Sequence, residues 1–243
     1  DQGADLHKAE VRQGVIRYIE DESDAASAEA LAAEHQLKFG RGYWRIVADY
    51  VHHDPDAPPE ILLKQEPRIL AIDNPFGVYG DPASKQPDGS DSRFYFIPED
   101  LDPDDYKERF GQDGYDAAHA GLETMRSVGD AAPDWFPKGK IRICEYFYVV
   151  TTYQEVAAKD GEREVTRKMP RRQVKWVLMN AAHVLERRDV PGPYIPIIPL
   201  LGERTVIDGV VDLKGLVRRA KDPQRMFDYG RAKTVETEAL APM

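Results

Sequence analysis

The sequence predicts an α+β fold, and three features predict this class. Apolar residues recur at helical spacing near both ends, and residues 141–156 are rich in aromatic and β-branched residues. Strands and helices also do not alternate as βαβ units would, which disfavours a parallel sheet. The 243 residues suffice for one large domain or two smaller ones, each with its own core.

Two helices are expected at the N-terminus. Residues 4–22 place Leu6, Val11, Val15, Tyr18 and Ile19 at amphipathic helical spacing. Asp24 is expected to cap a second helix, which runs through Leu37 and is rich in Ala and Glu. A turn containing Gly40 and Gly42 then ends the helical region.

Several strands follow. Residues 43–51 alternate large and polar side chains, and residues 61–72 read as a second strand, bent at Pro67 because proline donates no ladder hydrogen bond. Residues 74–82 (NPFGVYGDP) read as two turns around a short extended piece, and residues 93–97 as a further short strand.

A helix is expected over residues 98–111, because its acids come early and its bases late, as the helix dipole favours. Residues 112–139 give a weaker signal, with a short helix around residues 117–127. Residues 141–156 (IRICEYFYVVTTYQEV) give the strongest strand signal of the chain. A hairpin turn at residues 159–162 leads into a return strand near residues 164–168.

Residues 174–185 fit two structures equally well by periodicity: one helix, or two strands that turn near residues 179–182. The tail from Val210 to Leu240 reads as helix, with Pro223 in the first turn of a new helix capped by Asp222.

Composition and charge exclude several classes. No run approaches the roughly 18 apolar residues of a membrane span, and no signal peptide opens the sequence. With 33 Lys and Arg against 43 Asp and Glu, the net charge of −10 makes the whole chain a poor binder of phosphate. A single cysteine, Cys144, excludes an internal disulfide and a zinc site built on several cysteines. Because helical patterns run up to both ends, we expect the ends to be cuts through a larger protein.

The common catalytic signatures GxGxxG, GxxxxGK[ST], HExxH and GxSxG are absent from the sequence. The missing phosphate-binding loop means that this chain does not hydrolyse ATP through that motif. Cys144 lies in the strong strand, where burial makes a thiol inert.

Three places in the sequence carry residue types that can bind metal ions. His52 and His53 stand beside acidic residues in a loop, for which a solvated polar loop is the simpler interpretation. Asp56, Glu66 and Arg68 loosely resemble a metal-dependent nuclease, although a lysine is expected where Arg68 stands. The run of Asp81, Asp88 and Asp91 misses the calcium-loop order of an EF-hand, and a turn rich in Asp, Gly and Ser needs no ion.

Basic residues cluster between residues 167 and 175 and recur at residues 187–188 and 218–221. A solvated face balancing nearby acids is one interpretation, and a rim that faces phosphates is the other. Arg171, Arg172 and Lys175 are the residues we expect to face DNA.

The stretch PYIPIIPLLGE, residues 193–203, fits no enzyme template. Prolines at 193, 196 and 199 force an extended backbone, while its isoleucines and leucines demand burial. Such a stiff apolar strap most often joins two packed bodies.

Six stretches in this order resemble the portal proteins of short-tailed double-stranded DNA bacteriophages and prophages, over nearly the whole chain. They are AAEHQLKFGRGYWRIVADYV (residues 32–51), NPFGVYGDP (74–82), DGSDSRFYFI (88–97), IRICEYFYV (141–149), IPIIPLLGE (195–203) and AKDPQRMFDYG (220–230). The resemblance implies a structural head–tail connector with no catalytic residue, cofactor or metal. Its subunits form a homo-oligomeric ring, usually of twelve, at one capsid vertex, through which double-stranded DNA is translocated.

The implied partners are the terminase large subunit, whose ATPase pumps the DNA, together with scaffold and capsid proteins and tail adaptor proteins. The implied location is the virion, after assembly in the bacterial host cytoplasm, with no membrane. By the same analogy residues 1–111 form a wing- and stem-like part, 112–140 a connection, 141–209 a smaller β-rich clip-like part and 210–243 a stem or wing helix. The family's strands at this point favour the hairpin over residues 174–185.

Two departures accompany the resemblance. The family commonly carries a large aromatic where Gly230 stands, and its chains continue past Met243 toward channel-lining and crown elements, so ring formation is expected to need that part. Two other functions are kept as alternatives: a metal-dependent phage nuclease using Asp56, Glu66 and the neighbouring histidines, and a general phage interaction scaffold.

Overall fold

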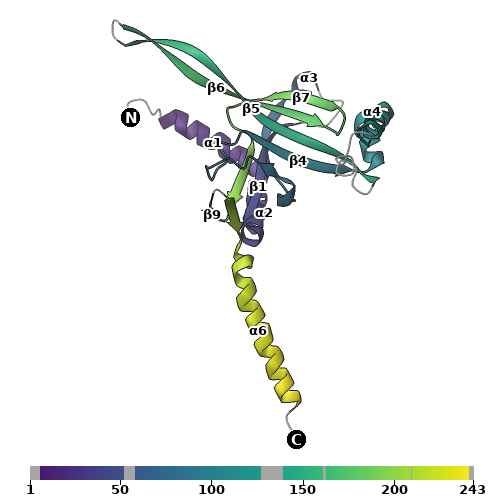
Figure 1. Ribbon diagram of the computed structural model, residues 1–243. Coiled ribbons are helices and arrows are strands. Elements are labelled where there is room, and N and C mark those ends of the chain that lie inside the picture. The colour runs from purple at the N-terminus through teal and green to yellow at the C-terminus, as the bar shows by residue number, and fades with distance from the viewer. Residues whose placement is uncertain (1–5, 52–57, 127–138, 161–162, 209, 241–243) are drawn as a thin grey trace. The chain divides into compact units, whose positions relative to one another are not determined.

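The computed structural model describes residues 6–51, 58–126, 139–160, 163–208 and 210–240, and the chain forms two compact units (Figure 1). Unit 1 comprises residues 1–75 and 196–243, and unit 2 comprises residues 76–195. The chain returns to unit 1 inside the proline-rich strap, between Ile195 and Pro196, so the prediction that the strap joins two packed bodies is confirmed. The wing, stem and clip-like parts, with bounds at residues 111, 140 and 209, stay a prediction.

Unit 1 is built on a three-stranded antiparallel sheet in the order β2-β1-β8. The strands are β1 (Arg41–Tyr50), β2 (Gln65–Ala71) and β8 (Ile197–Leu201). Helix α2 (Ala25–Phe39) packs on it through small side chains, with Ala25 and Ala28 against Ile69. A side chain at Gly42 would overlap the carbonyl of Ala32, so this glycine lets helix and strand approach closely.

The strap forms the edge strand β8, in which Ile197 is buried and Pro199 lies opposite Tyr43 of β1. An edge position suits proline, because one side of the strand needs no hydrogen-bond donor. The predicted extended backbone is present over residues 197–201, whereas residues 193, 194 and 196 form bends. The predicted burial holds for Ile195 and Ile197, while Ile198, Leu200 and Leu201 are only partly buried.

Helix α1 (Leu6–Glu22) buries none of its residues, and its last turn contacts β2. The predicted cap of α2 is wrong. Asp24 adopts a left-handed conformation, with φ 47° and ψ 48°, and its side chain makes no capping hydrogen bond, whereas a capping residue is normally extended.

Two further expectations for unit 1 need correction. Residues 61–72 are not one bent strand, since α3 (Pro59–Leu62) precedes β2 and Pro67 lies within β2 on the sheet edge. The tail is not helical from Val210, because the chain reverses at Asp208 (φ 51°) and β10 (Val210–Lys214) pairs with β9 (Glu203–Ile207). Helix α6 (Leu216–Ala239) then runs without a break, with Pro223 inside it.

Unit 2 is a five-stranded antiparallel sheet in the order β3-β4-β5-β6-β7. The strands are β3 (Tyr79–Gly80), β4 (Phe94–Leu101), β5 (Ile141–Asp160), β6 (Arg163–Met179) and β7 (Val184–Val190), and the short helix η1 (Pro75–Gly77) precedes them. Two helical segments were expected over residues 98–127, and α4 (Pro103–Arg126) consists of two that meet at Gly111, whose φ of 77° and ψ of 170° are not helical. The first segment starts later than expected because β4 continues through Leu101.

The core of unit 2 lies between α4 and the sheet. Tyr106 and Ala118 of α4 are buried against Ile141, Ile143 and Leu178. The Tyr106 hydroxyl accepts a hydrogen bond of 3.0 Å from the buried Asn180 amide, so the polar group is satisfied inside the core.

Residues 174–185 form the hairpin and not the helix. Asn180 makes the turn, because its Oδ1 accepts hydrogen bonds from the amides of Ala182 and His183 at 2.9 and 2.6 Å. Val174 and Leu178, which fit helical spacing, are instead buried along β6.

Candidate nucleic-acid interface on the long hairpin

The hairpin of β5 and β6 is much longer than the sheet around it (Figure 1). Strand β4 pairs with β5 only as far as Tyr148, and β7 pairs with β6 only from Val174 onward. We call residues 141–151 and 172–179 the proximal half, and residues 152–160 and 163–171 the distal half. The distal strands pair only with each other in the described part of the chain, and every distal side chain that is described is exposed.

A loop holds the hairpin where the two halves meet. This loop, residues 81–93, is called the collar, and its carbonyl at Arg93 accepts a 2.9 Å hydrogen bond from the amide of Val149. Asp81 ties the collar together: its carboxylate accepts hydrogen bonds from the Arg93 side chain at 2.6 and 3.0 Å and from the Arg93 and Ala83 amides. These hydrogen bonds, first that from the Arg93 side chain, lower the pKa of the buried Asp81 to about 2.

Arg172, predicted to face DNA, is bound to the collar. Its guanidinium donates to the carbonyls of Ser90 and Ser92 at 2.9 and 3.3 Å, and its central carbon lies 5.6 Å from the centre of the Tyr194 ring. Sequence reasoning missed these partners, since Ser90 lies 82 positions away.

Lys175, also predicted to face DNA, lies in the proximal half with its Nζ 3.0 Å from Asp189 Oδ1 on β7. The same carboxylate accepts a hydrogen bond from Gln173. The charge of Lys175 is therefore balanced within unit 2.

Arg171, the third predicted residue, lies on the exposed distal half. Residues alternate between the two faces of a strand, so Arg171 shares a face with Met169 and Arg167. Among the described residues neither Arg167 nor Arg171 has an acidic partner, whereas Lys168 on the other face lies 3.5 Å from Glu155. The structure thus places the three predicted residues along one strand. Of the three, only Arg171 makes no side-chain hydrogen bond or ion pair with another described residue.

The other predicted basic pair, Arg187 and Arg188, lies on β7 beside a hollow of about 400 Å³ that Lys175 and Asp189 also line. Arg188 binds Glu186 at 2.5 Å and stacks 5.0 Å from the Trp176 ring centre. The charge of Arg188 is therefore also used in contacts within unit 2.

The residues of the nuclease alternative come together only in part. Asp56, His52 and His53 lie outside the described residues. Glu66 accepts hydrogen bonds from Lys64 Nζ and the Tyr18 hydroxyl, at 2.8 and 3.3 Å, and the first of these lowers its pKa. Within the described ranges no three His, Cys, Asp or Glu side chains gather as a metal site would need, so no observation favours this alternative.

The Asp-rich run and the cysteine have structural surroundings. Asp91 accepts hydrogen bonds from the Ser84 hydroxyl and the Lys85 and Gln86 amides, and Asp88 accepts one from the Ser90 amide. Burial raises the pKa of the Cys144 thiol to about 11, which keeps it protonated at neutral pH.

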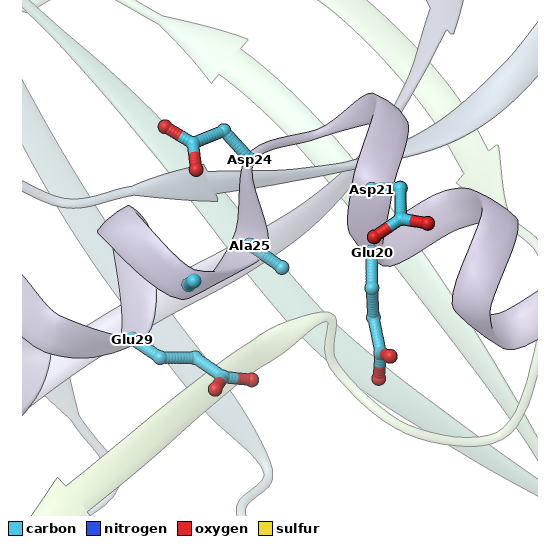
Figure 2. A pocket seen from close by; sticks show the side chains of 6 residues that line it. Glu20, Asp21, Asp24, Ala25 and Glu29 are labelled. Atoms are coloured by element: carbon cyan, nitrogen blue, oxygen red, sulfur yellow. The ribbon is translucent and has the colours of Figure 1, made fainter.

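Unit 1 carries an acidic hollow of about 340 Å³ where α1 meets α2. Figure 2 shows the carboxylates of Glu20, Asp21, Asp24 and Glu29 around it. None of the four forms an ion pair with another described residue. Nothing further at the hollow indicates a ligand, and we assign it none.

Comparison with known proteins decides the family. The phage P22-like portal protein family matches residues 1–243, the whole length of the chain. The chain belongs to the P22-like portal protein family. A curated relative, the portal protein of Acyrthosiphon pisum secondary endosymbiont phage 1, is 25% identical over 244 residues, which cover 88% of this chain and 32% of that protein. The chain therefore spans about a third of the length of this portal protein.

Membership confirms the resemblance drawn from the ordered motifs, and the mixed helices and sheets agree with the α+β class. The portal family is a structural one, of bacteriophage virion assembly and genome packaging. In the part of the chain that the structure describes, no helix combines the length and apolar character needed to cross a membrane.

Proposed function

We propose that this chain is part of a phage portal subunit, a head–tail connector whose copies form a ring around the DNA passage at one capsid vertex. The observation that carries the proposal is the family match over the entire chain. This chain corresponds to about a third of the relative's length. We therefore attribute the DNA channel, the docking of partner proteins and ring formation to the whole subunit and not to this part alone.

The exposed apolar side chains of α6 support assembly into a ring. This 24-residue helix buries none of its residues. An isolated helix is only marginally stable in water, and a Pro inside it lowers its stability further. Its exposed large hydrophobics suit contacts with other copies or other parts of the subunit; they are Leu216, Val217, Met226, Phe227, Tyr229, Val235 and Leu240.

The charge distribution supports a conduit that passes DNA without holding it. Many phosphate contacts would bind DNA tightly, and the net charge of −10 disfavours such binding. One free cation repeated around a ring would give a thin basic belt. Of the three predicted residues, Arg171 suits this role best, and Arg167 on the same face joins it; Arg172 and Lys175 would contribute only at the rim.

The proposed partners follow from the portal role. A separate terminase ATPase would supply the energy, in line with the missing phosphate-binding loop in this sequence. Scaffold and capsid proteins would meet the ring during assembly in the host cytoplasm, and tail adaptors would dock on it in the virion.

Negative-stain electron microscopy tests the ring. The protein carrying this chain, expressed from its complete reading frame, is expected to form closed rings with a central hole. Particles that remain monomeric at every concentration would contradict the proposal.

A packaging assay tests the DNA-facing residues. Arg171→Glu combined with Arg167→Glu is expected to lower the amount of DNA packaged per particle, because the belt changes sign. Arg12→Glu combined with Arg17→Glu, on the exposed helix α1, changes the net charge equally and is the control. Equal packaging by both double variants would remove the distal hairpin from the DNA path.

A further inference from the structure

The β9–β10 hairpin of unit 1 ends in an exposed aliphatic tip. Ile207 lies opposite Val210, and Val206 opposite Val211, so each face of the tip carries one aliphatic pair. Val206, Ile207 and Val210 are 56%, 61% and 68% exposed. A two-stranded hairpin has little core of its own, and clustered exposed aliphatics commonly mark an interaction surface.

A groove of about 290 Å³ lies at the other end of the same hairpin. Leu37 from the end of α2, Leu201 from β8 and Leu216 from the start of α6 give it apolar walls. Lys214 and Arg219 also line it. Leu37 and Leu216 are more than half exposed, so the groove lacks a cover within unit 1 as described.

Three glycines fix the base of the hairpin beside this groove. The Gly202 amide donates a 2.8 Å hydrogen bond to the Gly40 carbonyl, and Gly40 (φ +84°) ends α2. A Cβ on Gly40 or Gly202 would lie 2.8 or 2.7 Å from Lys214 backbone atoms, and one on Gly215 would lie 2.6 Å from the Lys38 carbonyl. The backbones are therefore wedged together, and the hairpin leaves the groove in a fixed direction.

This geometry keeps the tip away from the groove of its own chain. Each strand of the hairpin has five residues, so the tip lies roughly 16 Å from the base. A contact between the two surfaces must then join different copies of the chain.

The tip and the groove are complementary in character. The tip presents aliphatic side chains beside the acidic Asp208, and the groove presents leucines beside Glu203 and two cations, Lys214 and Arg219. Lys214 lies 3.3 Å from Asp212 of the same hairpin. Arg219 already pairs with Glu203, and a guanidinium has donors enough for a second carboxylate.

We propose that the aliphatic tip of one copy, formed by the side chains of Val206, Ile207, Val210 and Val211, seats in the groove lined by Leu37, Leu201 and Leu216 of the next copy. The contact is head-to-tail, because each copy offers a different surface to each neighbour, and such contacts generate rings or open chains of subunits. It rests on the proposed function in one respect: the ring that it would build is the portal ring. Both surfaces belong to unit 1.

Cysteine cross-linking tests the contact without disturbing the core. Val210→Cys marks the tip and Leu37→Cys marks the groove, both at exposed positions. The native Cys144 is buried, and its thiol pKa of about 11 keeps it unreactive under mild oxidation. Mixed single variants are expected to give a disulfide dimer and nothing larger, whereas the chain carrying both changes is expected to give a ladder of oligomers.

Matched variants separate specific contact from collision. Tyr153→Cys, exposed on the distal half of the long hairpin, is mixed with Leu37→Cys and is expected to cross-link at least tenfold more slowly. Equal rates for Tyr153→Cys and Val210→Cys would overturn the proposal. Faster dimerisation of Val210→Cys alone would also overturn it, because it would show a symmetric contact between two tips.

Electron microscopy separates this inference from the portal proposal. If rings form and Val210→Asp leaves them intact, the tip contact fails while the portal ring stands. If the cross-linked ladder forms but the complete protein gives no closed ring, the tip contact stands and the portal ring fails.

Discussion

The proximal and distal halves of the long hairpin share the same two strands, yet they differ in what covers them. In the proximal half Ile143, Val174 and Leu178 are fully buried, and Ile143 and Leu178 belong to the core that packs against α4. In the distal half no further strand is described beside the ladder, and Tyr153 is 71% exposed. The same strand signal therefore produces a core in one half and a free surface in the other.

The charges differ in the same way. Proximal Lys175 and Arg172 bind Asp189 and the collar carbonyls, whereas distal Arg171 has no acidic partner among the described residues. A side chain that is already bound to its own fold has less freedom to bind a partner. The collar marks the boundary between the proximal half, whose basic side chains bind other groups of unit 2, and the exposed distal half.

Removing core volume tests the comparison most strongly. Leu178→Ala is expected to lower the free energy of unfolding of unit 2 by about 3 kcal/mol, because it leaves a cavity beneath α4. Urea denaturation followed by circular dichroism measures it. Met169→Ala, on the exposed distal part of the same strand, is the control and should change stability by less than about 0.5 kcal/mol. Equal losses would mean that the distal half is packed.

The collar carboxylate gives the next largest effect. Asp81→Asn is expected to cost about 2 kcal/mol at neutral pH, since the pKa of this carboxyl is about 2 in the folded chain against 3.8 normally. A carboxyl group whose pKa is lower in the folded chain stabilises the fold at pH values above its unfolded pKa. This stabilisation is lost as the pH falls toward the folded pKa. The difference between the native chain and Asp81→Asn should therefore shrink between about pH 4 and pH 2.

Asp73→Asn, at an exposed position before the collar, is the control for Asp81→Asn. Urea denaturation at several pH values should show no pH-dependent difference for it. A difference for Asp81→Asn that is constant from pH 7 to pH 2 would contradict the ion pair as its source.

The sequence predicted the strands of the hairpin well but not its division into halves. The β-branched and aromatic residues of 141–156 indicate a strand, and they do so without regard to whether a neighbour lies alongside. The division depends on β4, β7 and the collar, which reach β5 and β6 from far along the chain. For the same reason Arg171 and Arg172 looked equivalent in sequence.

Two incorrect predictions of secondary structure in unit 1 each follow from the backbone conformation of a single residue. The sequence predicts helix from Val210, whereas the reversal at Asp208 makes Val210–Lys214 a strand that pairs with β9. Asp24 is a typical capping residue in the right place, and its left-handed backbone prevents the cap. The family could be predicted from the sequence without the structure, because the order of the six motifs indicated it, and the family match confirms it.

Adjacent arginines allow a closer test at the boundary. Arg172→Ala is expected to cost about 1–2 kcal/mol, because two collar carbonyls lose a charged donor. Arg171→Ala should leave stability unchanged within error, since it has no such partner. Hydrogen exchange of residues 81–93 should increase for Arg172→Ala alone. Increased exchange in both variants would place Arg171 within the collar contacts as well.

Two cross-strand ion pairs give the smallest expected difference. Arg142 and Asp100 lie directly opposite each other in the proximal part, with nitrogen–oxygen distances of 2.6 and 2.9 Å and both side chains about one-third exposed. Glu155 and Lys168 lie opposite each other in the distal half, at 3.5 Å and largely in solvent. Arg142→Gln is expected to cost about 1 kcal/mol, because a two-point pair outside bulk solvent resists screening. Lys168→Gln should change nothing measurable. Urea denaturation at low and high salt should show a loss for Arg142→Gln at both, and an equal loss for Lys168→Gln would show that the distal half is shielded from solvent by a partner.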